Sequence, residues 1–242
     1  MELLDRECIT NLPTSFRVIG IGEATKEIIE SVKSYGYDCV YASVLAEPFE
    51  CVPTDEDKMV IIVAKDNEDH ANSIAKTFHE AGVLTIGLLD NANLECYDGV
   101  VVETSCTEYA DLTKALLQPI ATQGIIYYDI NDLQTALTDA KHFFIKSATG
   151  HGNERVAEAI GLIKSTLTSS LLNKIERLSI FLYFNKEDKQ PLVMQEMTAV
   201  TDFVSELPES IYVIWAVYPD ESINDEEIKI TILTAGKELE NG

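Results

Sequence analysis

The sequence is poor in basic residues: 18 Lys and Arg stand against 41 Asp and Glu in 242 residues, which gives a formal net charge of −23. Both halves share this excess, with 8 basic and 22 acidic residues up to position 120 and 10 and 19 after it. Nucleic acids and anionic membrane surfaces are bound through Lys and Arg, which displace phosphate counterions. The composition therefore argues against both partners, and a polyanionic ligand would have to enter against a repulsive field.

Long apolar runs and paired cysteines are also missing. No stretch approaches the roughly 18 apolar residues that span a bilayer, and the charges within Met1 to Thr14 do not fit a signal peptide. The four histidines are dispersed, and the odd number of cysteines includes no CxxC pair, so the sequence indicates neither a metal site nor a disulfide framework. We expect free thiols in a reducing cytoplasm. The cysteines are Cys8, Cys39, Cys51, Cys96 and Cys106.

The apolar content, 46% of residues, is sufficient for folded cores. Up to residue 105, strand and helix patterns alternate. The run from Lys58 to Ala64 is almost continuously apolar, which is typical of a strand buried on both faces of a parallel sheet. The alternation predicts a Rossmann-like parallel α/β domain. Strands are expected at 16–22, 39–44, 58–64, 83–88 and 99–103, and helices at 23–35 and 71–81.

The pattern changes after residue 105. A long helix is expected over 107–122, with Pro119 ending or bending it. The remaining elements predict an α+β unit with a mixed or antiparallel sheet, in which the Trp215 strand belongs to the core. We therefore divide the chain into a shortened Rossmann-like domain, 1–105, a central helix, 106–123, and a C-terminal domain, 124–242. The later strands are expected at 142–148, 178–184, 211–217 and 228–233, and the later helices at 132–140, from Gly150 onward and at 194–207.

Four segments of the second half resemble the FtsZ branch of the tubulin superfamily. Residues 124–133, GIIYYDINDL, are similar to the family's loop GLINVDFADV. Residues 148–160 are similar to its Gly-x-Gly-x-x-x-Arg-Ala-x-x-Ala stretch, and residues 170–172 resemble its Ser-Pro-Leu-Leu motif, with the proline replaced by a serine. Residues 218–236 are similar to Asp-Pro-x-Met-x-Asp-x-x-Arg-Val-Thr-Val-Val-Ala-Thr-Gly. Four matches in the same order are more specific than any one of them, and they imply an FtsZ/tubulin-like fold.

The first half follows the family's layout but departs from its nucleotide-binding loops. Arg17 to Gly22 looks like the first strand and the start of the first glycine loop, so Gly20 and Gly22 are the remnant of a cofactor-binding turn. The family's second glycine loop is replaced by Lys65-Asp-Asn-Glu-Asp-His-Ala71. Glycine-rich loops bind phosphate because backbone N–H groups can approach closely. The chain from Val44 to Lys58 is also too short to complete the family's pocket.

Three carboxylates, those of Asp66, Glu68 and Asp69, therefore stand where a triphosphate would lie in the family. Each contact between like charges in a partly buried site costs a few kcal/mol at an effective dielectric near 20. Magnesium could bridge the charges, but the backbone cradle would still be absent. The alternative function of these residues is to cap the following helix and interact with its dipole, and coordination of a metal by the cluster is a third possibility.

The resemblance gives a different meaning to Asp129 and Asp132. In the family, carboxylates at these positions enter the nucleotide site of the neighbouring subunit and polarise the attacking water, so here they would be catalytic in trans. Tyr127 replaces the usual Asn. The alternative is structural: Asp132 caps the following helix and Asp129 forms an Asx turn. Arg155, with the glycines before it, is interpreted as part of a helix-entry turn.

The favoured hypothesis is an FtsZ/tubulin-like protein that lacks its own GTP site and serves in cell division or the cytoskeleton. It would be a cytoplasmic pseudo-GTPase that assembles with itself or with an FtsZ-like filament protein, without nucleic acid or membrane insertion. No cofactor is expected, or GTP with magnesium should the site survive, and any enzymatic activity would be GTP hydrolysis. One alternative is a working GTPase with an unconventional pocket. A second is a small α/β nucleotide- or dinucleotide-dependent enzyme, although the cofactor fingerprint is incomplete.

Overall fold

The computed structural model describes residues 15–47, 50–102, 108–138, 140–187 and 192–239. Its strands are ordered β2-β1-β3-β4-β5-β6-β9-β7-β8 in a nine-stranded sheet. The strands are β1 (Ser15–Ile21), β2 (Val40–Leu45), β3 (Asp57–Ala64), β4 (Leu84–Leu88), β5 (Gly99–Val101), β6 (Lys141–His151), β7 (Arg177–Phe184), β8 (Tyr212–Pro219) and β9 (Glu227–Ala235). The α-helices are α1 (Lys26–Ser34), α2 (Glu68–Glu80), α3 (Tyr109–Ala121), α4 (Ile130–Leu137), α5 (Arg155–Thr166), α6 (Ser169–Leu172) and α7 (Thr198–Ser205). Short 3-10 helices are η2 (Glu23–Thr25), η3 (Leu94–Cys96) and η5 (Gly152–Glu154).

The first five strands are parallel to their neighbours, as the sequence predicts. Their carboxyl ends meet at one edge, where η2 and α1 follow β1 and α2 follows β3. In open parallel sheets this edge is where ligands bind. The second half is mixed, because β9 runs antiparallel to both β6 and β7 whereas β7 and β8 are parallel. The predicted fold class is therefore confirmed in both halves.

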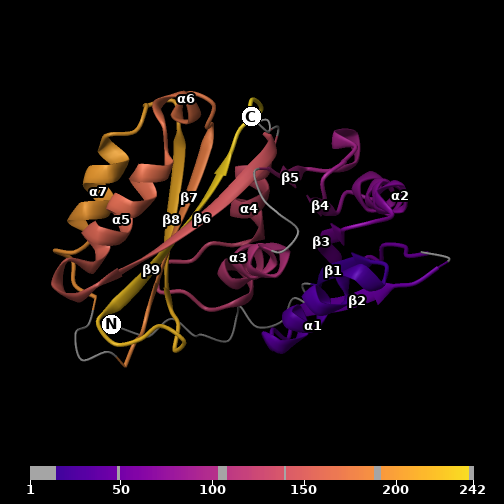
Figure 1. Ribbon diagram of the computed structural model, residues 1–242, viewed down its shortest axis with the longest axis horizontal. Helices are drawn as coiled ribbons and strands as arrows, with labels where there is room; N and C mark the ends of the chain where they lie inside the picture. The colour runs from indigo at the N-terminus through magenta and orange to yellow at the C-terminus, as the bar shows by residue number, and fades with distance from the viewer. Residues whose placement is uncertain (1–14, 48–49, 103–107, 139, 188–191, 240–242) are drawn as a thin grey trace, which may run out of the picture.

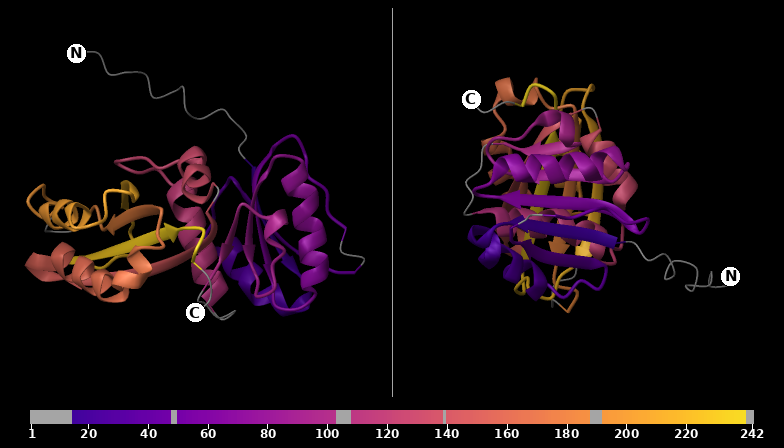
Figure 2. Two further views of the ribbon diagram at one scale, coloured as in Figure 1. Left: turned by 90° about the horizontal axis from the view of Figure 1, so that it is seen from above. Right: turned by 90° about the vertical axis from the view of Figure 1, so that its right-hand side faces the viewer.

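Helices cover both faces of the sheet. One apolar cluster joins α1, α3 and α4 to one face, and includes Val101 and Phe143. The opposite face has two clusters: α2 packs over the first strands, next to Val100, and α5 and α7 pack over the later strands, next to Val102 and Phe144. Figure 1 shows α3 between the two groups of strands, and the left view of Figure 2 shows the two halves of the chain on either side of a central helical segment.

Several elements differ from the sequence prediction. Helix α2 begins at Glu68 rather than near Ala71, and α7 is confined to Thr198–Ser205. Strand β6 continues through Gly150, which pairs with Ile228 of β9, so the helix expected from Gly150 begins only at Arg155. The prediction for Trp215 was wrong in part, because β8 is the last strand of the sheet and the Trp215 side chain is 38% exposed.

Among the cysteines, Cys39, Cys51 and Cys96 are free thiols, and Cys96 is buried. Cys8 and Cys106 lie outside the described residues, as does the last residue of the strand expected at 99–103.

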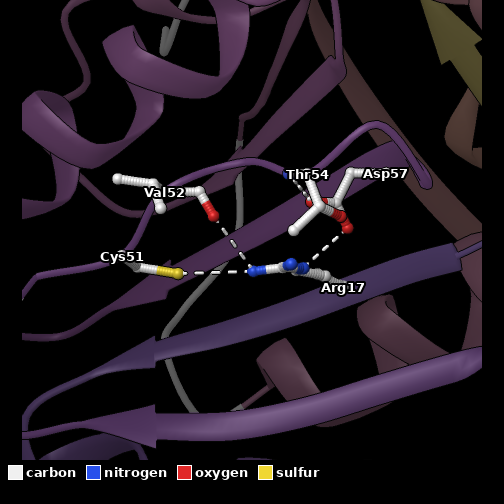
Figure 3. A network of polar contacts seen from close by, with 5 residues as sticks. All are labelled: Arg17, Cys51, Val52, Thr54 and Asp57. Atoms are coloured by element: carbon white, nitrogen blue, oxygen red, sulfur yellow. Dashed lines mark hydrogen bonds and ion pairs between the residues drawn. The ribbon is translucent and has the colours of Figure 1, made fainter.

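A polar network fixes the short connection between β2 and β3 (Figure 3). The Arg17 guanidinium of β1 donates from Nε to Oδ1 of Asp57, 2.6 Å away, and from a terminal nitrogen to the carbonyl oxygen of Val52 at 3.3 Å. The other oxygen of Asp57 accepts hydrogen bonds from the backbone and hydroxyl of Thr54. Because the Asp57 side chain is fully buried, this ion pair holds the connection against the sheet.

Candidate functional site

Gly20 and Gly22 lie where β1 leads into η2, at the carboxyl edge of the parallel strands. A Cβ on Gly20 would come within 2.7 Å of Cγ1 of Ile29, so glycine is required there for helix α1 to approach the strand. Gly22 has a φ of +78°, and its N–H donates to the carbonyl of Leu45 at 2.9 Å. The Thr25 hydroxyl donates to the Gly22 carbonyl at 2.8 Å. The N–H and the carbonyl of Gly22 are therefore both hydrogen-bonded within the protein.

The acidic segment before α2 lies against the same turn. Asn67 is the N-cap residue, with a left-handed φ of +60°, and its side-chain nitrogen would be 3.1 Å from a Cβ built on Gly22. The Glu68 carboxylate accepts hydrogen bonds from the side-chain amide of Asn91, at 2.5 Å, and from its backbone N–H, at 3.2 Å. Asn72 adds a hydrogen bond to the Asn91 carbonyl. Hydrogen bonds thus link the start of α2 to the loop that contains Asn91, and Asn67 lies close to Gly22.

Three cavities in the described part of the chain lie away from these turns. They have volumes of about 410 to 470 Å³, and their walls include none of residues 20–25 or 65–72. Glu68 and Asp69 occupy the first turn of α2, where carboxylates interact favourably with the helix dipole. No group of three or more potential metal ligands is present among the described His, Cys, Asp and Glu residues. No helix in the described ranges is long and apolar enough to cross a membrane.

Asp129 and Asp132 form a reciprocal capping box at the start of α4. Oδ1 of Asp129 accepts hydrogen bonds from the N–H groups of Asn131, at 2.7 Å, and Asp132, at 3.0 Å. Oδ2 of Asp132 accepts from the N–H of Asp129 at 2.9 Å. Asp129 is exposed, beside the exposed apolar side chains of Ile125 and Tyr127. The capping alternative thus describes their contacts within one chain, and a role in trans stays a prediction.

Substitution of Asp129 by alanine is expected to lower the free energy of unfolding by about 1 kcal/mol, because it removes the acceptor for two N–H groups of the first turn of α4. Asp129→Asn keeps an amide oxygen there and is expected to change stability by only a few tenths of a kcal/mol. Urea denaturation measures both. An Asp129→Asn variant as unstable as Asp129→Ala would show that the charge, rather than the hydrogen bonds, stabilises the helix.

Arg155, Gly150 and Gly152 have structural roles. The Arg155 side chain is fully buried, and its Nε donates to Oε1 of Glu196 at 2.9 Å, which fixes the segment before α7 on α5. Gly152 has a φ of +67°, and Gly150 lies against the first turn of α5. The helix-entry interpretation describes this geometry. Sequence reasoning did not find the partners that close the two loops, Thr25 and Asn91, because neither stands in a recognisable motif.

About half of the chain is similar in sequence to a known protein. The chain is 30% identical over 130 residues to cell division protein FtsZ of Porphyromonas gingivalis, in a match that covers 52% of this chain and 27% of that relative. No family model matches the chain.

Solved structures of several such proteins share the fold. An empty FtsZ dimer from M. jannaschii has a TM-score of 0.71 at 14% identity, covering 93% of this chain and 89% of that one. GDP-bound monomeric CetZ1 from Haloferax volcanii has a TM-score of 0.60 at 12% identity, covering 92% and 94%. CetZ2 from the same organism, as a GTPγS-bound protofilament, also has a TM-score of 0.60 at 12% identity, covering 93% and 94%. These likenesses confirm the predicted fold.

Proposed function

We propose that the chain, which is similar in sequence to part of an FtsZ and shares the FtsZ fold, is a member of the FtsZ/tubulin superfamily that serves as a filament-assembly or filament-interacting module without a GTP site of its own. The observation that carries the proposal is the direct approach of the Asn67 side chain to Gly22, between the two turns that would hold phosphates. The module would act in the cytoplasm, in cell division or the cytoskeleton, and its partner would be a second copy or an FtsZ-like filament protein.

Two physical effects oppose GTP at this edge. First, the Gly22 N–H is already bonded to Leu45, so it is not available as a phosphate donor. Second, Glu68 and Asp69 place carboxylates in the first turn of α2, the position that favours a phosphate in a glycine loop. Two unit charges of like sign 4 Å apart repel by about 4 kcal/mol at an effective dielectric of 20. A triphosphate would meet this repulsion without a backbone cradle to offset it.

Assembly is supported by the neighbours of this fold, which include a dimer and a protofilament. The loop before α4 exposes Ile125 and Tyr127, with 64% and 59% of their surfaces accessible, next to Asp129. An exposed apolar pair beside a charged group is typical of a protein contact. We propose that this loop meets the partner.

The GTP-binding part of the proposal is tested by equilibrium dialysis of the full chain with labelled GTP at millimolar magnesium. We expect no saturable binding in the micromolar range, whereas a conventional FtsZ dialysed in parallel should bind. Micromolar affinity would overturn the proposal and favour a working GTPase with an unconventional pocket, the alternative that nucleotide-bound CetZ1 and CetZ2 support.

The interaction with filaments is tested separately, by co-sedimentation with full-length FtsZ and measurement of the phosphate that FtsZ releases. If Asp129 acts on the partner's nucleotide, Asp129→Asn should abolish any stimulation of phosphate release while keeping the capped helix and the co-sedimentation. Stimulation that survives in Asp129→Asn would restrict this carboxylate to its structural role. Failure to co-sediment, combined with a single species of monomer mass in solution, would overturn the assembly function.

A further inference from the structure

A polar cavity of about 470 Å³ lies between α3 and the strands of the second half. This is within the size range of small-molecule sites. Its walls come from distant parts of the chain: Lys114 and Gln118 of α3, Ser147 of β6, Tyr183 of β7, and Lys229 and Thr231 of β9. None of these residues belongs to the turns around Gly22 and Asn67.

Three lysines line this cavity, Lys114, Lys146 and Lys229, and Lys114 acts electrostatically on Lys229. Lys114 and Lys229 are half-buried, and neither has an ion pair or a hydrogen bond with any residue the structure describes; the Lys114 ammonium lies 5.7 Å from the centre of the Tyr35 ring. Burial and the neighbouring charge of Lys114 lower the pKa of Lys229, against the opposing fields of Asp220 and Asp111. In a chain with a net charge of −23, this cavity gathers positive charge from distant parts of the sequence, although Glu108 and Asp111 also line it.

The third feature is the hydroxyl of Tyr183. Lys229 is the neighbour of Tyr183 across the β7–β9 ladder. The Tyr183 side chain is 1% exposed, its ring stacks on Tyr218 with centroids 5.5 Å apart, and its hydroxyl has no hydrogen-bond partner in the described part of the chain. Buried polar groups are nearly always hydrogen-bonded, and an exception calls for an explanation such as a ligand or an ion.

We propose that this cavity binds a small organic anion through the ammonium groups of Lys114 and Lys229, with the Tyr183 hydroxyl as a further donor. The anion would carry a phosphate or a carboxylate group, since both accept hydrogen bonds from ammonium and hydroxyl donors. Glu108 and Asp111 also line the cavity. Their charges disfavour an extended polyanion and restrict the ligand to one compact anionic group on a small molecule.

The test is calorimetric titration of the full chain with glycerol phosphate in one arm and glycerate in the other, at low ionic strength, since each probe is a small organic molecule with one anionic group. We expect one saturable site for at least one probe, and the tighter probe identifies the anionic group. Lys229→Gln and Lys114→Gln should each weaken that probe about tenfold or more. Lys33→Gln is the matched control, because it removes the same charge from an exposed pair on α1 and should change affinity less than about twofold. Absence of saturation for both probes, or an equal loss in the Lys33→Gln control, would overturn the proposal.

Tyr183→Phe separates binding from folding. Removing a buried hydroxyl without a partner should leave the ligand-free chain at least as stable, so the thermal transition should stay in place or rise. The affinity for the tighter probe should fall about threefold or more if the hydroxyl donates to the anion. Unchanged affinity would remove Tyr183 from the site, and loss of the folded state would show that its hydroxyl already has a structural role.

Discussion

Replacing Arg155 by methionine is expected to destabilise the protein by about 3 to 5 kcal/mol, a large part of the stability of a typical domain. The Arg155 side chain is fully buried and that of Glu196 is 8% exposed. Methionine fills much of the same volume but leaves the Glu196 carboxylate buried without its cation. That carboxylate also accepts the N–H of Val193 at 3.0 Å, so it cannot turn to solvent without breaking a second contact. Urea denaturation at neutral pH measures the loss.

The double variant Arg155→Met with Glu196→Gln provides the control. With both charges removed, the amide of glutamine can still accept from Val193, and we expect stability to return to within about 2 kcal/mol of the parent. A matched surface change, Lys33→Met in the exposed pair with Glu30, should leave the unfolding transition almost unmoved. If Arg155→Met proves equally mild, the ion pair is not what holds α5 to the segment before α7.

Features that depend on residues close along the chain could be predicted from the sequence, whereas the ion pair of Arg155 could not. Apolar spacing located most strands and helices, and the order of the motifs predicted the fold, because both are properties of residues that are close along the chain. The partner of Arg155, by contrast, is 41 positions away, on a segment with no pattern of its own. Helix α7 was predicted too long for a related reason. The residues just before Thr198, which the prediction included in the helix, form turns that are fixed by this tertiary contact.

In the candidate sites, too, the local features could be predicted from the sequence and the tertiary contacts could not. The acids of residues 66–69 and the pair Asp129 and Asp132 were found from local sequence, and so was the capping alternative, since a capping box spans only four residues. The contact between Asn67 and Gly22 depends on a left-handed φ at Asn67, which sequence does not specify for a residue other than glycine. The lysine cavity was missed because strand register, which brings Lys229 beside Tyr183, is set by the whole sheet.

Alanine at Gly150 is expected to be the most damaging single-methyl change in the chain, with a loss on the order of 4 kcal/mol or more. A Cβ on this residue would overlap the carbonyl oxygen of Arg155 and lie 2.7 Å from its carbonyl carbon and 2.9 Å from the backbone nitrogen of Ala159. All three atoms are helix backbone, so no rotamer change can relieve the overlap. Either α5 must move off the sheet or β6 must leave its register with Ile228.

Movement of α5 would expose the apolar residues that it buries on β6 and β9, among them Val156, Ile160 and Ile163. The control is Gly161→Ala in the same helix, where a new Cβ meets no atom within 4 Å. That change should be neutral or stabilising by about 0.5 to 1 kcal/mol, because alanine is the better helix former. The methyl group added on β6 and the one added on α5 are thus expected to change stability in opposite directions, and thermal denaturation of the two variants measures the difference. Equal transitions would mean that α5 does not lie in close contact with β6 at Gly150.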